Sequence, residues 1–162
     1  MVLKKVALDI LYQPFDKKPY RVIVHPYLLK EFSNRWYVFG KNHKTGLIER
    51  FGLDRIISFE VSHHDFIEDP SFDPNDFFKD VIGVTVPVNG NPIKIILSFN
   101  REQGNYAKTK PLHHSQKILK DTRDELQVEL MLIPNYELKK LLWSFGDTVK
   151  VLEPKNLFQL CK

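Results

Sequence analysis

The sequence predicts an α+β protein made of two small modules, a β-barrel followed by a unit of the ferredoxin-like plan. The chain has 162 residues, 43% hydrophobic and 12% aromatic, which is enough apolar surface for a core. The charge changes sign twice along the chain. Residues 1–62 carry 11 Lys and Arg against 6 Asp and Glu, residues 63–90 carry 1 against 6, and residues 91–162 carry 12 against 8. The hydrophobic pattern also changes, from period two in the first block to alternating strands and helices in the last. We therefore expect modules at 1–62 and 82–162, joined by an acidic connector at 63–81.

The first module is predicted to be a meander of short strands. Apolar residues alternate with polar ones, and turn residues such as those at 14–19 separate the runs. The predicted strands cover 6–12, 20–25, 35–40, 47–51 and 57–61, with a helical turn at 54–56. Pro26 has no N–H, so we expect it to end the second strand. Four or five short strands in about 60 residues favour a closed or nearly closed barrel.

The acidic connector is predicted to hold one short helix. Asp73 is placed to cap it, Pro74 occupies its first position and Asp76 its first turn. Phe72 and Phe77 stand where a hydrophobic staple would form. Because acidic residues suit the positive end of a helix dipole, we interpret them as structural rather than metal-binding.

The second module is predicted to alternate strands with two helices. Strands are expected at 84–88, 93–99, 115–120, 126–133 and 149–152, and helices at 101–109 and 138–145. The second helix carries apolar residues at i, i+3, i+4 and i+7, and Gly146 follows it in the position that closes a helix. The order strand, helix, strand, strand, helix, strand is that of the ferredoxin-like plan.

Several classes of protein are disfavoured. No apolar stretch approaches 18 residues and charges interrupt the first ten, so neither a membrane span nor a signal peptide is expected. The single cysteine, Cys161, permits no intrachain disulfide, which fits a reduced, cytoplasmic protein. The adjacent histidine pairs at 63–64 and 113–114 lack metal-ligand spacing. No nucleophile elbow or phosphate loop is present either, so we expect no enzymatic activity, no metal and no cofactor.

The chemistry that remains lies in cationic and aromatic side chains of the first module. They are Arg21, His25, Tyr37, Arg50 and Arg55. Arginine binds phosphate through a fork of donors and tyrosine stacks on bases, so a small barrel with this set suits a nucleotide or a single strand. The alternative is that Trp36 belongs to the core and that the arginines pair with Glu49, Asp54 and Glu60. Composition and spacing leave both interpretations open.

The same stretch resembles the WYL-domain family. The name-giving triplet is present as Trp36-Tyr37-Val38, with valine in place of the usual leucine. Spaced positions before the triplet match the family at Tyr12, Arg21, Pro26 and Leu29. After it, residues 50–56 look like the family's Arg-Phe-x-Leu-Asp-Arg-Ile signature. Residues from about 82 to 157 look like the C-terminal extension that often follows a WYL domain, with matching features at 138–146, 149–154 and Leu157.

The resemblance implies an Sm-like small barrel followed by a ferredoxin-like module. It also implies a ligand-sensing module of a bacterial transcription regulator, whose ligand is single-stranded nucleic acid or a nucleotide-like anion. Carried over by position, the ligand residues are Tyr12, Arg21, His25, Tyr37, Arg50 and Arg55, while Trp36 is a packing residue. The alternative function is a ligand-free oligomerisation or scaffold module.

Two partners are expected from similar proteins. In these a helix-turn-helix domain precedes the WYL domain, and here the first predicted strand begins within the first ten residues. We therefore expect either the C-terminal part of a longer regulator or a protein that acts without its own DNA-reading helix. Similar proteins commonly form homodimers through their C-terminal regions, and Trp143 lies beside the apolar stripe of the helix at 138–145.

Overall fold

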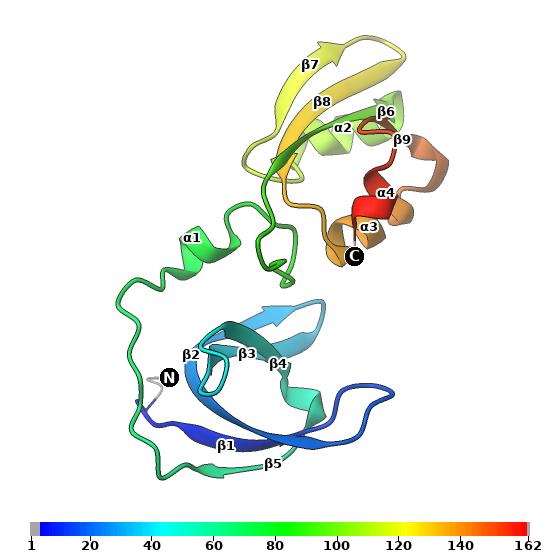
Figure 1. Ribbon diagram of the computed structural model, residues 1–162. Coiled ribbons are helices and arrows are strands. Elements are labelled where there is room, and N and C mark those ends of the chain that lie inside the picture. The colour runs from blue at the N-terminus through cyan, green and yellow to red at the C-terminus, as the bar shows by residue number, and fades with distance from the viewer. Residues whose placement is uncertain (1–3, 162) are drawn as a thin grey trace. The chain divides into compact units, whose positions relative to one another are not determined.

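The computed structural model describes residues 4–161, which fall into two compact units that meet in sequence between Pro74 and Asn75 (Figure 1). This division lies within the predicted connector. The short helix α1 (Pro74–Phe78) occupies it, with Pro74 in the first helical position as predicted. No helix among residues 4–161 is long and apolar enough to cross a membrane.

Unit 1 is one antiparallel sheet in the strand order β4-β3-β2-β1-β5. Its elements are β1 (Leu8–Tyr12), β2 (Tyr20–Phe32), β3 (Arg35–Asn42), β4 (Ile48–Gly52), the 3₁₀ turn η1 (Leu53–Arg55) and β5 (Ile56–Val61). The predicted strands are therefore present, and the helical turn lies at 53–55 rather than 54–56. The inner face buries a small cluster of Ile10, Tyr12, Val22, Val24, Val38 and Phe51.

The sheet of unit 1 is open, so of the two predicted alternatives, a closed or a nearly closed barrel, the closed barrel was wrong. Strands β4 and β5 lie at opposite edges, yet only the three residues of η1 join them. Because extended residues span at most about 3.5 Å each, the sheet curls until its two edges approach. The 3₁₀ turn interrupts the extended backbone between them, and the Gln13 N–H donates to the Arg55 carbonyl at 3.0 Å, on the β1 side. The strands described include no ladder between β4 and β5.

Two further expectations for unit 1 were wrong. Strand β2 does not end at Pro26 but runs on to Phe32, because a bulge between Pro26 and Leu28 already interrupts the ladder where the proline lacks its N–H. Trp36 is not a packing residue, since its side chain is 52% exposed. It pairs with Glu31 near the end of the β2–β3 hairpin, beyond the last residues that pair with β1 or β4.

Unit 2 is a second antiparallel sheet in the order β7-β8-β6-β9. Its elements are β6 (Ile93–Asn100), α2 (Arg101–Thr109), β7 (Lys117–Asp121), β8 (Glu125–Leu132), α3 (Tyr136–Ser144), η2 (Gly146–Thr148), β9 (Val149–Glu153) and α4 (Leu157–Leu160). From β6 to β9 they follow the predicted order of strands and helices. Inward residues of β6 and β8 and apolar residues of the helices share one core, which includes Leu97, Val128, Leu138 and Leu157.

Local signals explain the helices of unit 2. Asn100 and Asn135 cap α2 and α3 by accepting backbone N–H groups at 2.9 and 2.8 Å. Gly146 ends α3 with a φ of +56°, which favours glycine. The strand predicted at 84–88 does not form. Asn135 instead donates to the carbonyls of Ile82 and Thr85, both at 2.8 Å, and so satisfies this segment without a ladder.

The structure thus shows an α+β protein with two antiparallel sheets. The Sm-like and ferredoxin-like assignments of the two units stay predictions.

Candidate ligand-binding site

Two arginines of unit 1 lie against tyrosine rings. The Arg50 guanidinium carbon is 5.3 Å from the centre of the Tyr37 ring, and that of Arg55 is 5.7 Å from the Tyr12 ring. The β3–β4 register explains the first pair, because Tyr37 faces Gly52 and Arg50 is its diagonal neighbour. The turn η1 brings the second arginine back toward β1. Both distances are those of a cation–π contact, which attracts each guanidinium to the face of its tyrosine ring.

The Arg55 side chain is largely buried. Its side chain is 18% exposed, and its guanidinium also lies 4.9 Å from the Phe15 ring. The buried Nε has no hydrogen-bond partner among the described residues. The Asp54 carboxylate is 3.4 Å away, which is close enough for an ion pair but not aligned for a hydrogen bond. A buried donor without an acceptor is unusual in a folded protein, so the Nε of Arg55 is an unsatisfied hydrogen-bond donor.

Gly52 makes room for this arginine. A Cβ on Gly52 would lie 2.3 Å from Arg55 Nη2 and 2.7 Å from Asp54 Oδ1. Its φ of −71° is ordinary for any residue, so space and not backbone conformation requires glycine here. Since Gly52 also pairs with Tyr37, the Arg50–Tyr37 and Arg55–Tyr12 stacks meet at this position.

An open pocket of about 430 Å³ is lined by Arg55 and, among others, by Phe15, Asp16, Asp54 and Ile57. Asp54 also pairs with Arg35, at 3.1 Å. Reasoning from sequence did not single out Phe15, Arg35 or Gly52. Only Gly52, inside the signature at 50–56, carried a signal that could have found it.

Tyr12 supports the site from below. It is 5% exposed, packs edge-on against Phe51 with ring centres 5.2 Å apart, and its hydroxyl accepts the Gly52 N–H at 3.3 Å. Tyr12 therefore contacts Arg55 through its ring and Gly52 through its hydroxyl, and so holds both residues in position.

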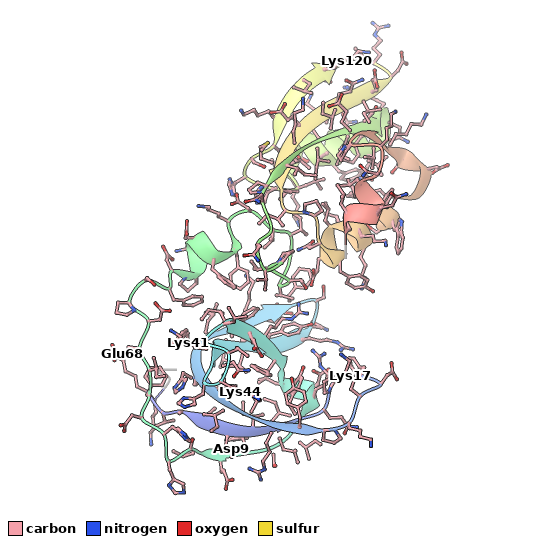
Figure 2. The ribbon with its side chains drawn as sticks, viewed as in Figure 1. Asp9, Lys17, Lys41, Lys44, Glu68 and Lys120 are labelled. Carbon is pink, nitrogen blue, oxygen red and sulfur yellow. The ribbon has the colours of Figure 1, made fainter. Side chains whose placement is uncertain are left out.

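Arg21 lies beside a different pocket. Its guanidinium pairs with Asp9 at 3.1 Å and Glu60 at 3.0 Å, and these carboxylates, Glu60 first, raise the pKa of Arg21. The pocket of about 410 Å³ next to it is also lined by His43 and Lys44. Figure 2 labels Asp9 and Lys44 among the side chains of unit 1.

His25 is fully buried and turned toward the connector rather than toward solvent. Its Nδ1 accepts the Ile67 N–H at 3.1 Å, which places the ring proton on Nε2, 3.1 Å from His43 Nδ1. The His43 ring in turn lies 4.4 Å from that of His64. Burial, and then the neighbouring His43, His64 and Lys41, lower the pKa of His25. The histidine therefore holds residues that follow β5, a long-range contact that no local pattern could reveal.

The alternative drawn from the sequence is partly right. Asp54 and Glu60 do pair with arginines, whereas Glu49 accepts from the side chains of Asn42 and Thr45 at 2.9 Å each. Among residues 4–161, no group of three or more His, Cys, Asp or Glu side chains is placed to hold a metal ion.

Known families match most of the chain. Residues 1–61 match the WYL domain, and residues 91–160 match the WCX domain. A CRISPR Cas-related protein is similar in fold, with 10% identity and a TM-score of 0.54, over 96% of this chain and 44% of that one. The proteasome accessory factor B/C (PafBC) of Arthrobacter aurescens matches with 18% identity and a TM-score of 0.37, over 96% of this chain and 23% of that one. The chain spans less than half the length of either protein, and no curated protein matches it.

Proposed function

This chain belongs to the WYL-domain family, and on that basis we propose that it is the ligand-sensing module of a WYL-type bacterial transcription regulator. The ligand is single-stranded nucleic acid or a nucleotide-like anion. It binds where the Arg50–Tyr37 and Arg55–Tyr12 stacks meet. The folds of the two units in this proposal are the Sm-like and ferredoxin-like ones that the resemblance implies.

The observation that carries the proposal is the buried Nε of Arg55, which lacks an acceptor in the part of the chain that the structure describes. Because this Nε is buried, a phosphate oxygen in the pocket lined by Arg55 reaches it once the Arg55 side chain shifts toward the pocket. The guanidinium of Arg50 then binds the next phosphate. A guanidinium over a tyrosine ring also provides a surface on which an unpaired base stacks. Tyr37, Arg50 and Arg55 contact the ligand in this proposal, and Tyr12 positions Arg55.

The remaining two predicted residues have other places in the proposal. Arg21 lies at the separate pocket beside His43 and Lys44, where it would bind a further phosphate of a longer strand. His25 does not contact the ligand in this proposal, and its role is to hold the connector by its hydrogen bond to Ile67.

The position of η1 suggests how binding becomes a signal. The turn is the short link between the two edges of an open, curled sheet. A ligand that binds Arg55 within this link favours one curvature of the sheet over others, and that shift in population is what a DNA-binding domain would sense.

Fluorescence anisotropy with a labelled single-stranded oligonucleotide tests the proposal at several salt concentrations. We expect Arg55→Ala to weaken binding by roughly 10- to 100-fold, the value of a charge-assisted hydrogen bond of about 1.5–3 kcal/mol. The slope of log affinity against log salt should become less steep by about 0.7 for one lost phosphate contact.

The matched control is Arg123→Ala, which removes the same charge from an exposed turn of unit 2. Equal losses in both variants would mean unspecific attraction to a basic protein. An absence of binding at low salt would favour the scaffold function instead.

A further inference from the structure

The outer strand of unit 1 exposes a row of apolar side chains. Ile57, Phe59 and Val61 on β5 are 54%, 68% and 63% exposed. Phe59 pairs with Ile10, which is 1% exposed, and Val61 pairs with Leu8, so Phe59 and Val61 share the face that forms the core. Ile57 lies at the bulge where the register shifts and Tyr12 pairs with Ile56. The row therefore extends the core face of the sheet to its edge, where no other part of the described chain buries it.

The backbone of β5 is also unpaired along its outer side. The sheet order places β5 at the edge, and no strand of residues 4–161 pairs with it beyond β1. The Ser62 N–H donates to the Ala7 carbonyl at 2.8 Å, so the N–H and C=O groups of Glu60 and Ser62 point toward β1. Because direction alternates along a strand, those of Phe59 and Val61 point outward. Glu60 is the only charge in β5, and the strand holds neither lysine nor proline to protect its edge.

We propose that β5 pairs antiparallel with β5 of a second copy of this chain, about a two-fold axis at Phe59. In this register Phe59 faces Phe59 of the second copy, and Ile57 faces Val61. All the outward backbone groups of one strand then meet outward groups of the other. The apolar rows lie on one continuous face, and the two sheets become one.

The charges of β5 favour this occupant and this register. Each Glu60 lies opposite Ser58 of the second copy, not opposite its own counterpart, and its carboxylate stays paired with Arg21 of its own chain. Centring the pair on Glu60 would oppose two like charges and would need backbone groups that already bond β1. Centring it on Val61 would place Ile57 and Phe59 opposite residues beyond the end of the strand. A self-complementary edge that closes with one partner also limits growth into longer assemblies.

Sedimentation velocity of the whole chain over a range of concentrations tests the pairing. We expect a dimer, and we expect Phe59→Lys to weaken it by roughly 30-fold or more, since two lysines would meet at the axis. Ser58→Lys is the control on the same strand, because it adds the same charge on the opposite face and opposite Glu60 of the second copy. That variant should keep the dimer or tighten it. A chain that stays monomeric at all concentrations, or a Phe59→Lys chain that dimerises like the wild type, would overturn the proposal.

Cross-linking distinguishes this interface from one in unit 2. Paired residues that exchange both hydrogen bonds have Cα atoms about 5.5 Å apart, within disulfide range. In a Cys161→Ser background, Phe59→Cys should form disulfide-linked dimers under mild oxidation, whereas Leu119→Cys, exposed on β7, should not. Equal cross-linking of both variants would also overturn the proposal. None of these measurements involves the ligand, so their failure and that of the proposed function are separable.

Discussion

The two units differ in how completely the apolar face of each sheet is covered. In unit 2, helices supply the apolar residues that cover β6 and β8, and the central strands are almost wholly buried on that face. Among the described residues of unit 1, no helix completes the core and no ladder closes the sheet. A tyrosine and a histidine lie buried there with polar atoms bonded to backbone groups. A protein places binding groups where the fold does not use every donor, acceptor and apolar surface for itself. The difference therefore points to unit 1 as the interacting unit and to unit 2 as the more self-sufficient one.

The largest expected effect tests whether the two units are independently stable, by removing a buried side chain from unit 2. Leu97→Ala should cost unit 2 about 2–5 kcal/mol of unfolding free energy, because Leu97 is fully buried in its core. Unit 1 has its own core and should keep its stability and its oligonucleotide binding.

The two tryptophans make the measurement possible, since Trp36 lies in unit 1 and Trp143 in unit 2. Denaturant unfolding is followed by fluorescence in Trp143→Phe and Trp36→Phe backgrounds, which report units 1 and 2 respectively. If both tryptophans shift together by the same amount, the units are not independent and the comparison fails.

Acid should lower the stability of unit 1 through His25. Burial also lowers the pKa of His113 in unit 2, so each unit is followed by its own tryptophan. Burial lowers the pKa of this histidine in the folded state, so the unfolded chain takes up a proton more readily. The stability of unit 1 should thus be full above about pH 6.5, the usual histidine pKa, and fall as the pH drops toward the lowered value. Protonation of Nδ1 would also remove the acceptor of the Ile67 N–H.

His25→Gln tests this origin of the acid response. The variant should be less stable at pH 7.5, by about 1–3 kcal/mol for a disrupted buried hydrogen bond, and should lose less between pH 7.5 and 5.5. The measurement is the denaturation midpoint of unit 1, read from Trp36. An unchanged pH response in the variant would assign that response to groups other than His25.

The smallest expected effect separates folding from binding within unit 1. Gly52→Ala should change stability by less than about 1 kcal/mol, because its φ is ordinary and the nearest atoms are the ends of flexible side chains. The added methyl group displaces Arg55 and should weaken oligonucleotide binding by up to about tenfold.

Gly46→Ala is the matched control. Gly46 has a φ of +71° and open space around a Cβ, so this variant should lose about 1 kcal/mol of stability while binding stays unchanged. The reverse pattern, with Gly46→Ala alone weakening binding, would contradict the site.

Expectations from the sequence held where local chemistry decides structure. The hairpin of β3 and β4, the turn η1, the helices α2 and α3 and the closing Gly146 all follow from turn residues and hydrophobic period. The resemblance to WYL domains was also correct, because its motifs are spaced along a stretch that the family match covers. The strand expected at 84–88 failed because Asn135, 50 and 53 residues along the chain from its partners Thr85 and Ile82, satisfies the backbone there.

For the site, the sequence by itself determined which residue types are present: arginines next to apolar positions, tyrosines in strands, a glycine between two arginines. Only the tertiary structure decided their use. It stacks Arg55 on Tyr12 and leaves its Nε without an acceptor, buries His25 against Ile67, and exposes Trp36 and the apolar row of β5. The physical reason is that period and propensity act over a few residues. Burial and hydrogen-bond partners instead depend on which strands become neighbours and on whether the sheet closes.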